Sequence, residues 1–269
     1  MRHKQTYQIS ELTPYINWVY FFYAWQLKDR KQQADLKSEA LSMLERFEGR
    51  YHAYGLVLLT DAGSEGDDIL IDVDGGVRRI PMLRQQGAAP TLCLSDFLRP
   101  ATAGSLTDRI GLFATTVDIG LETDFNGDDY RKMMAQLLAD RLAEAAAEKL
   151  HEHVRKVLWG YAKDEQLNIH EMQLEHFVGI RPAVGYPSMP DTSVNFILSD
   201  ILKFSDIGIR LTERGAMKPH ASVSGLMIAH PSSRYFAVGT IGEDQLRDYA
   251  LRRGIPIELM RRFLASNLA

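Results

Sequence analysis

The sequence feature that most constrains the fold is one long stretch of helical periodicity at residues 128–161. Its apolar residues recur at intervals of three and four, at Tyr130, Met133, Met134, Leu137, Leu138, Leu142, Ala145, Leu150, Val154, Val157 and Leu158. This spacing predicts a single long helix. Its apolar stripe must be covered by another layer of structure.

Strand patterns and shorter helical patterns alternate irregularly around this helix. Strands are expected at 54–60, in two runs within 67–83 around the hairpin signal Asp74-Gly75-Gly76, and at 109–117, 208–213, 222–229 and 235–240. Helices are expected at 34–47, 165–177 and 193–204, followed by two short ones that begin near Glu243 and Pro256. Residues 9–27 are dense in aromatic side chains and indicate a short helix or irregular segment laid on the core.

These patterns predict the fold class. Because the strands do not follow regular βαβ alternation, we expect an α+β fold with a largely antiparallel sheet flanked by helices. Neither an internal repeat nor a low-complexity linker divides the chain, so we expect one domain over residues 1–269.

Charge and cysteine content narrow the function class. The formal net charge of −4 argues against a nucleic-acid-binding protein. The N-terminus lacks the apolar core of a signal peptide, and no window approaches the roughly 18 apolar residues of a membrane span. Cys93 is the only cysteine, which excludes an internal disulfide and a cysteine-based zinc site. We therefore expect a cytoplasmic protein that makes no membrane contact.

A basic cluster stands near the C-terminus, at Arg252, Arg253, Arg261 and Arg262. It is typical of a solvated helix face. The alternative is a docking surface for an acidic protein.

Glu144 is an unusual residue of the predicted long helix. Seven residues advance a helix by nearly two turns, so Leu137, Glu144, His151 and Leu158 share one mostly apolar stripe. A carboxylate on such a stripe needs a partner or a functional reason. A structural ion pair, or a stripe edge that faces water, is the alternative.

The loop 179–187 offers a binding group for an anion. Its prolines restrict the backbone and its glycines permit close approach, while Arg181 presents a fork of donors suited to a carboxylate or phosphate. A rigid turn with a structural arginine ion pair is equally compatible with this pattern.

Residues 216–236 combine small residues with His230. The small residues would let a backbone pack closely against a ligand or partner, and His230 is a candidate proton carrier or a hydrogen-bonded structural histidine. Dinucleotide-binding, phosphate-loop, metalloprotease and nucleophile-elbow motifs are absent from the sequence. An Asp-x-His-x-x-Gly motif, which would place a histidine beneath cobalamin, is absent as well.

Several longer motifs resemble a known family. The segment GIRPAVGYPSMPD is similar to the R-P-A-x-G-Y-P-x-x-P-[DE] signature of the C-terminal activation domain of cobalamin-dependent methionine synthase. The opening YINWVYFFYAWQL resembles that family's Y-I-D-W-T-P-F-F-x-x-W-x-L. Further similar segments follow in the family's order, at 66–69, 138–162, 211–225, 229–241 and 244–254.

The resemblance implies a function. Such a domain presents S-adenosylmethionine, and a flavodoxin-like reductant supplies an electron, so that inactive cob(II)alamin on the cobalamin-binding domain or subunit is restored to methylcobalamin. The chain is thereby expected to be the reactivation component of a methyltransferase. The initiating Met1 and a C-terminus near the family's natural end favour a separate subunit over an excised domain.

The resemblance also implies site residues. Arg181 would bind the carboxylate of S-adenosylmethionine, and Glu144 and Glu175 would lie near the sulfonium. The remaining positions expected to contact the ligand are Asn17, Ala183, Gly185, Tyr186 and Tyr235. No residue is assigned as a catalytic or metal-binding group.

The sequence departs from the family pattern at several positions. Asn17 replaces the aspartate that takes the ligand's ammonium group, Val19 and Tyr20 replace Thr-Pro, Lys218 and His220 replace Trp and Gly, and Thr192 stands in place of a histidine. These changes bear on ligand affinity and on the surface that faces the corrinoid. Two other functions therefore stay open: an activator of a different corrinoid methyltransferase, and a degenerate binding module without chemistry.

Overall fold

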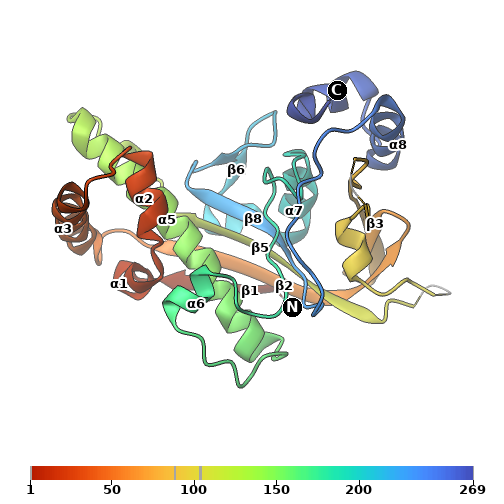
Figure 1. The fold of residues 1–269 in the computed structure, drawn as a ribbon, viewed down its shortest axis with the longest axis horizontal. Coiled ribbons are helices and arrows are strands. Elements are labelled where there is room, and N and C mark those ends of the chain that lie inside the picture. The colour runs from red at the N-terminus through yellow and green to blue at the C-terminus, as the bar shows by residue number, and fades with distance from the viewer. Residues whose placement is uncertain (1, 88, 103–104, 269) are drawn as a thin grey trace.

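A six-stranded sheet forms the centre of the computed structural model, which describes residues 2–87, 89–102 and 105–268 (Figure 1). The strand order is β4-β3-β2-β5-β8, and β1 pairs with β2 beside this path. All strand pairings within the sheet are antiparallel. The strands are β1 Arg2–Tyr7, β2 Ala53–Glu65, β3 Asp68–Val73, β4 Gly76–Pro81, β5 Asp108–Val117 and β8 Ser222–Met227. The predicted α+β class with a largely antiparallel sheet is confirmed.

Strand β2 is long enough to serve two strands on one edge. Its first half pairs with β1, from Ala53 opposite Tyr7 to Leu58 opposite Arg2, and its end pairs with β3. Its other edge pairs with β5 along residues 53–62. We did not predict β1, because its sequence RHKQTY carries no apolar alternation and becomes a strand only through this pairing.

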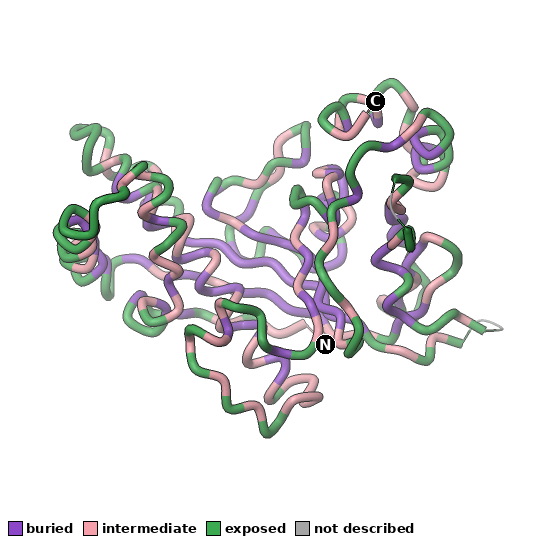
Figure 2. The backbone as a smooth tube through the Cα atoms, viewed as in Figure 1, coloured by how far each residue is buried: buried purple, intermediate pink, exposed green. Residues whose placement is uncertain are grey.

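The two faces of the sheet bury separate cores, as the alternation of side chains along a strand requires. Val57, Phe113 and Met227 face the core under α5, whereas Leu56, Leu112 and Leu226 face the core under α7 (Val194–Leu202). Helices α1 (Ile9–Leu12), α2 (Trp18–Ala24) and α3 (Arg30–Phe47) lie on the α5 side (Figure 1). The buried strands run through the centre of the molecule in Figure 2.

The predicted long helix is present as α5, Asp129–His153, and continues as a π-helical turn, Val154–Leu158. Asp128 begins it, since its carboxylate accepts a hydrogen bond from the Arg131 N–H. Leu142, Ala146 and Leu150 are fully buried against the sheet. The helix therefore offers one side of its length as a rigid support for whatever lies beside it.

Two predicted elements are shorter in the structure, and a third is not formed. The helix expected at 165–177 is only α6, Ile169–Gln173, because Glu175 takes a left-handed backbone with φ of 58°. The strand expected at 208–213 is only β6, Arg210–Leu211, paired with β7, Met217–Lys218. Residues 235–240 form no strand, because side chains rather than a strand ladder satisfy this backbone: Ser188 donates to the Phe236 carbonyl and Gln85 to that of Ala237.

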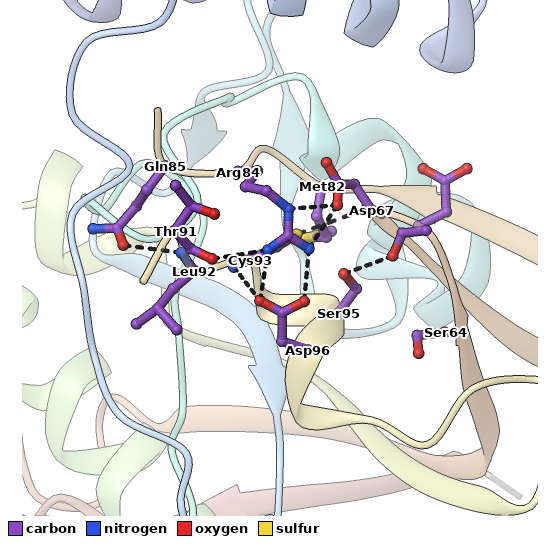
Figure 3. Close-up of polar contacts among 12 residues, drawn as sticks. Ser64, Asp67, Met82, Arg84, Gln85, Thr91, Leu92, Cys93, Ser95 and Asp96 are labelled. Atoms are coloured by element: carbon purple, nitrogen blue, oxygen red, sulfur yellow. Dashed lines mark hydrogen bonds and ion pairs between the residues drawn. The ribbon is translucent and has the colours of Figure 1, made fainter. Parts of the chain in front are cut away.

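Helices α8 (Glu243–Arg253) and α9 (Ile257–Phe263) close the chain at the end of the molecule opposite α3 (Figure 1). A polar cluster lies nearby, in which Arg84 donates to Asp67 and Asp96 (Figure 3). The Arg84 backbone also exchanges hydrogen bonds with the Gln245 side chain of α8. Within this cluster, burial raises the pKa of the Cys93 thiol to about 11, which keeps it protonated at neutral pH.

The C-terminal arginine cluster is largely committed to internal ion pairs. Arg252 pairs with Asp68 and Asp248, Arg261 with Glu243, and Arg253 lies within 3.5 Å of buried Asp191. These pairs tie α8 and α9 to the rest of the fold. Arg262, the fourth member of the cluster, is exposed.

Candidate functional site

The loop 179–187 is attached to the open edge of β8. Ile180 exchanges two backbone hydrogen bonds with Ile228, and the N–H groups of Val184 and Leu226 donate to Ser224 and Pro182. A Cβ atom at Gly225 would stand 2.1 Å from the Pro182 carbonyl oxygen. Gly225, one of the small residues expected to let a backbone pack against a ligand or partner, thus makes room for the chain's own loop.

Arg181 projects from this loop onto α5. Its guanidinium group donates to the Ala147 carbonyl at 2.9 Å and to the Glu148 carboxylate at 3.0 Å. The side chains of Arg181 and Glu148 are only 13% and 16% exposed. Burial opposes the charged form of Arg181, but the carboxylate of Glu148 holds its pKa above the ordinary value. Arg181 thus makes a structural ion pair, which was one interpretation of the sequence. It also has N–H donors beyond the two in use, so binding of an anionic group stays open to it.

Glu144 lies one turn before Glu148 on the same side of α5. It is half-buried at the border of the apolar stripe, where its carboxylate accepts a hydrogen bond of 2.8 Å from the Tyr186 hydroxyl. Burial and this carboxylate raise the pKa of Tyr186. The loop is thus fixed to α5 at Arg181 and Tyr186. Ala183 and Gly185 lie between these two anchors.

Glu175 reaches the same area from the end of α6. Burial raises the pKa of the Glu175 carboxyl. The positive charge of Arg181 opposes this rise, and the negative charge of Glu148 adds to it. Glu175 itself follows the end of α6 in a left-handed backbone conformation.

Tyr235 arrives from the irregular segment after β8. Its hydroxyl oxygen accepts a hydrogen bond of 2.9 Å from the Arg181 backbone N–H, and the residue is 39% exposed. In the same segment, His230 accepts a hydrogen bond through Nδ1 from the Ser232 N–H. The structure thus places His230 within a local turn and Tyr235 beside Arg181.

Asn17 is the cap of α2, where its Oδ1 accepts a hydrogen bond from the Val19 N–H at 3.1 Å. The residues around it lie along α5: the Tyr15 hydroxyl donates to Glu152, and the Arg141 guanidinium group lies over the Tyr20 ring. Gln173, two residues before Glu175, donates to the carbonyl of neighbouring Ile16. Asn17 therefore lies between α5 and α6, with no direct contact to Arg181.

The loop 179–187 and Tyr235 thus meet beside α5, whereas α2 contacts α5 separately and α6 bonds to the segment before α2 through Gln173. The charged groups of the candidate site are Glu144 and Glu148 of α5, Arg181 of the loop, and Glu175 after the end of α6. This combination suits a ligand that carries a carboxylate together with positive charge. Among the residues that the structure describes, no cluster of three or more His, Cys, Asp or Glu side chains is arranged to hold a metal ion.

Glu148 is the member of this cluster that the sequence did not reveal. It follows a run of alanines in a helix with many charged residues, so its position carried no signal. Its pairing with Arg181, 33 residues away, exists only in the folded chain.

At the surface that was expected to face the corrinoid, Lys218 and His220 are exposed near the β6–β7 pair. The Thr192 hydroxyl donates to the Arg214 carbonyl at 3.0 Å.

The described part of the chain has no helix long and apolar enough to cross a membrane.

Comparison with known proteins identifies the family of this chain and a solved structure with a similar fold. The sequence matches the family model of the vitamin B12 dependent methionine synthase activation domain over residues 8–254. The fold is similar to that in the crystal structure of the MetH reactivation domain bound to AdoHcy, with a TM-score of 0.93 and 38% sequence identity. The similarity covers 100% of this chain and 90% of that one.

Proposed function

This chain belongs to the activation-domain family of vitamin B12 dependent methionine synthase, and we propose that it binds S-adenosylmethionine over the middle of α5. The bound ligand supplies the methyl group for reductive remethylation of cob(II)alamin. The observation that supports the binding site is that Arg181 and Tyr186 of the loop 179–187 bond to Glu148 and Glu144 of α5, which are distant from them in the sequence. The similar MetH domain is bound to AdoHcy, the demethylated form of the proposed ligand.

Each residue has a proposed part in binding. The donors of Arg181 that are not used by Ala147 and Glu148 take the ligand's carboxylate. Glu144 and Glu175 attract the sulfonium, and Asn17 accepts from the amino group. Ala183 and Gly185 allow the backbone to approach the ligand, and the exposed rings of Tyr186 and Tyr235 cover it.

Cobalamin belongs to a partner in this proposal. The sequence lacks the Asp-x-His-x-x-Gly motif that places a histidine beneath the corrin. The partner is the cobalamin-binding domain or subunit of methionine synthase, and a flavodoxin-like protein supplies the electron. We place the reaction in the cytoplasm.

Titration calorimetry tests this function. The isolated protein is expected to bind S-adenosylmethionine, and to give no heat with cobalamin added without a partner. An absence of S-adenosylmethionine binding at millimolar concentration, or tight binding of cobalamin alone, contradicts the proposal.

A further inference from the structure

We propose that Glu148 is a specificity-determining residue, which makes the site favour the cation S-adenosylmethionine over the uncharged thioether S-adenosylhomocysteine. This inference rests on the proposed function. Glu148 was not among the residues implied by the family resemblance, and its role follows from its pairing with Arg181.

The Glu148–Arg181 pair is largely withdrawn from water. One carboxylate oxygen, Oε2, accepts the bond from Arg181. The other, Oε1, is buried and has no hydrogen-bond partner among the described residues. No further donor in the part of the chain that the structure describes offsets the negative charge of this carboxylate. That charge therefore neutralises Arg181 and contributes to the electrostatic potential in the rest of the site.

The charge of Glu148 extends to the neighbouring groups. Burial raises the pKa values of Glu175, proposed to attract the sulfonium, and of Tyr235, proposed to cover the ligand; Arg181 opposes both rises and Glu148 adds to them. The cluster of Glu144, Glu148, Glu175 and Arg181 has a formal charge of −2 when all four groups are ionised. Neutralisation of Glu148 reduces this charge to −1.

The two ligands differ by one charge at sulfur. S-adenosylmethionine carries a sulfonium, an ammonium and a carboxylate, whereas S-adenosylhomocysteine lacks the sulfonium charge. A site with more negative charge favours the first ligand. With Glu148 present, Arg181 recognises the carboxylate by hydrogen-bond geometry without adding net positive charge to the site.

The test measures dissociation constants of both ligands by calorimetry for the parent and for Glu148→Gln. The ratio of the S-adenosylhomocysteine constant to the S-adenosylmethionine constant is expected to fall about fivefold, as the loss of one nearby charge predicts. Glu152→Gln is the matched control. It lies one turn along the same helix with a side chain 19% exposed and bonds to Tyr15, and its ratio should match that of the parent.

Two further variants separate charge from structure, and they serve even if Glu148→Gln fails to fold. Arg181→Gln should raise the ratio, because it makes the cluster more negative. The double variant Glu148→Gln/Arg181→Gln restores the parent's formal charge and leaves no unpaired member of the ion pair. It should return the ratio to the parent value while both affinities fall.

Two outcomes have distinct meanings. The inference is wrong, and Glu148 has only a structural role, if Glu148→Gln weakens the binding of both ligands equally and leaves the ratio unchanged. If that variant does not fold, the same conclusion follows when Arg181→Gln does not raise the ratio relative to the double variant. If the parent itself does not bind S-adenosylmethionine, the proposed function fails first.

Discussion

At the scale of single residues, Asn17 is the departure with the most direct consequence. Its Oδ1 already accepts a hydrogen bond from the Val19 N–H at the start of α2. Aspartate is an equally good helix cap and would add a second, charged oxygen at nearly the same volume. The exchange therefore tests the ligand contact with little change to the fold.

Asn17→Asp is expected to tighten S-adenosylmethionine binding about fivefold, because a charge-assisted hydrogen bond to the ammonium replaces a neutral one. Calorimetry measures this change. A ligand analogue without the amino group is the control, and its affinity should not respond. If the variant binds both ligands as the parent does, Asn17 does not contact the amino group.

Arg181 provides the second test at this scale. Arg181→Lys should weaken S-adenosylmethionine binding at least tenfold, a loss of about 1.4 kcal/mol. Lysine is a point charge and cannot contact Ala147, Glu148 and a carboxylate with the planar fork of arginine. A folded variant, verified by circular dichroism, with an unchanged dissociation constant would remove Arg181 from the site.

At the scale of elements, the site depends on how closely the loop 179–187 approaches β8. Gly225 makes this approach possible because any side chain there would meet the Pro182 carbonyl. The loop's hydrogen bonds to β8 and its two anchors on α5 then set the positions of Arg181 and Tyr186 together. A change in β8 should therefore reach the ligand through the loop.

Gly225→Ala is expected to lower the free energy of unfolding by about 1–3 kcal/mol, since the added methyl forces the two backbones apart. It should also weaken S-adenosylmethionine binding, although residue 225 is not proposed to touch the ligand. Urea denaturation and calorimetry measure the two effects. Gly76→Ala is the matched control in β4, where a Cβ atom would come no nearer than 3.9 Å to the Val73 carbonyl oxygen. Equal behaviour of the two variants would contradict the assigned role of Gly225.

At the scale of the whole molecule, buried polar bonds join the C-terminal helices to the chain that follows the ligand loop. The Tyr249 hydroxyl of α8 donates to Asp191 at 2.8 Å, and Arg253 donates to Ser193 at 2.7 Å. Both Tyr249 and Asp191 are at most 1% exposed. This junction lies at the far end of the loop segment from Arg181, so it contributes to stability without direct contact with the site.

Tyr249→Phe should lower the free energy of unfolding by about 1–3 kcal/mol, because it leaves a buried carboxylate with one donor fewer. The affinity for S-adenosylmethionine should stay at the parent value, because Asp191 keeps its bonds from Ser193. Urea denaturation and calorimetry on the same samples check both statements. If the free energy of S-adenosylmethionine binding falls by more than the free energy of unfolding, the C-terminal helices contribute to the geometry of the site.

The sequence alone determined the elements whose signals are local. The apolar spacing of 128–161 predicted α5, and Asp74-Gly75-Gly76 predicted the β3–β4 hairpin, because helix faces and tight turns depend on neighbouring residues. The family resemblance supplied candidate residues of the site, which remain predictions.

Only the tertiary structure decided the features that depend on distant partners. Strand β1 forms because β2 offers it an edge, and the loop 179–187 lies on β8 because Gly225 leaves room for it. Glu148 meets Arg181 because α5 and that loop converge on the same face of the sheet. Pairings of this kind join residues tens of positions apart, so neither composition nor spacing records them.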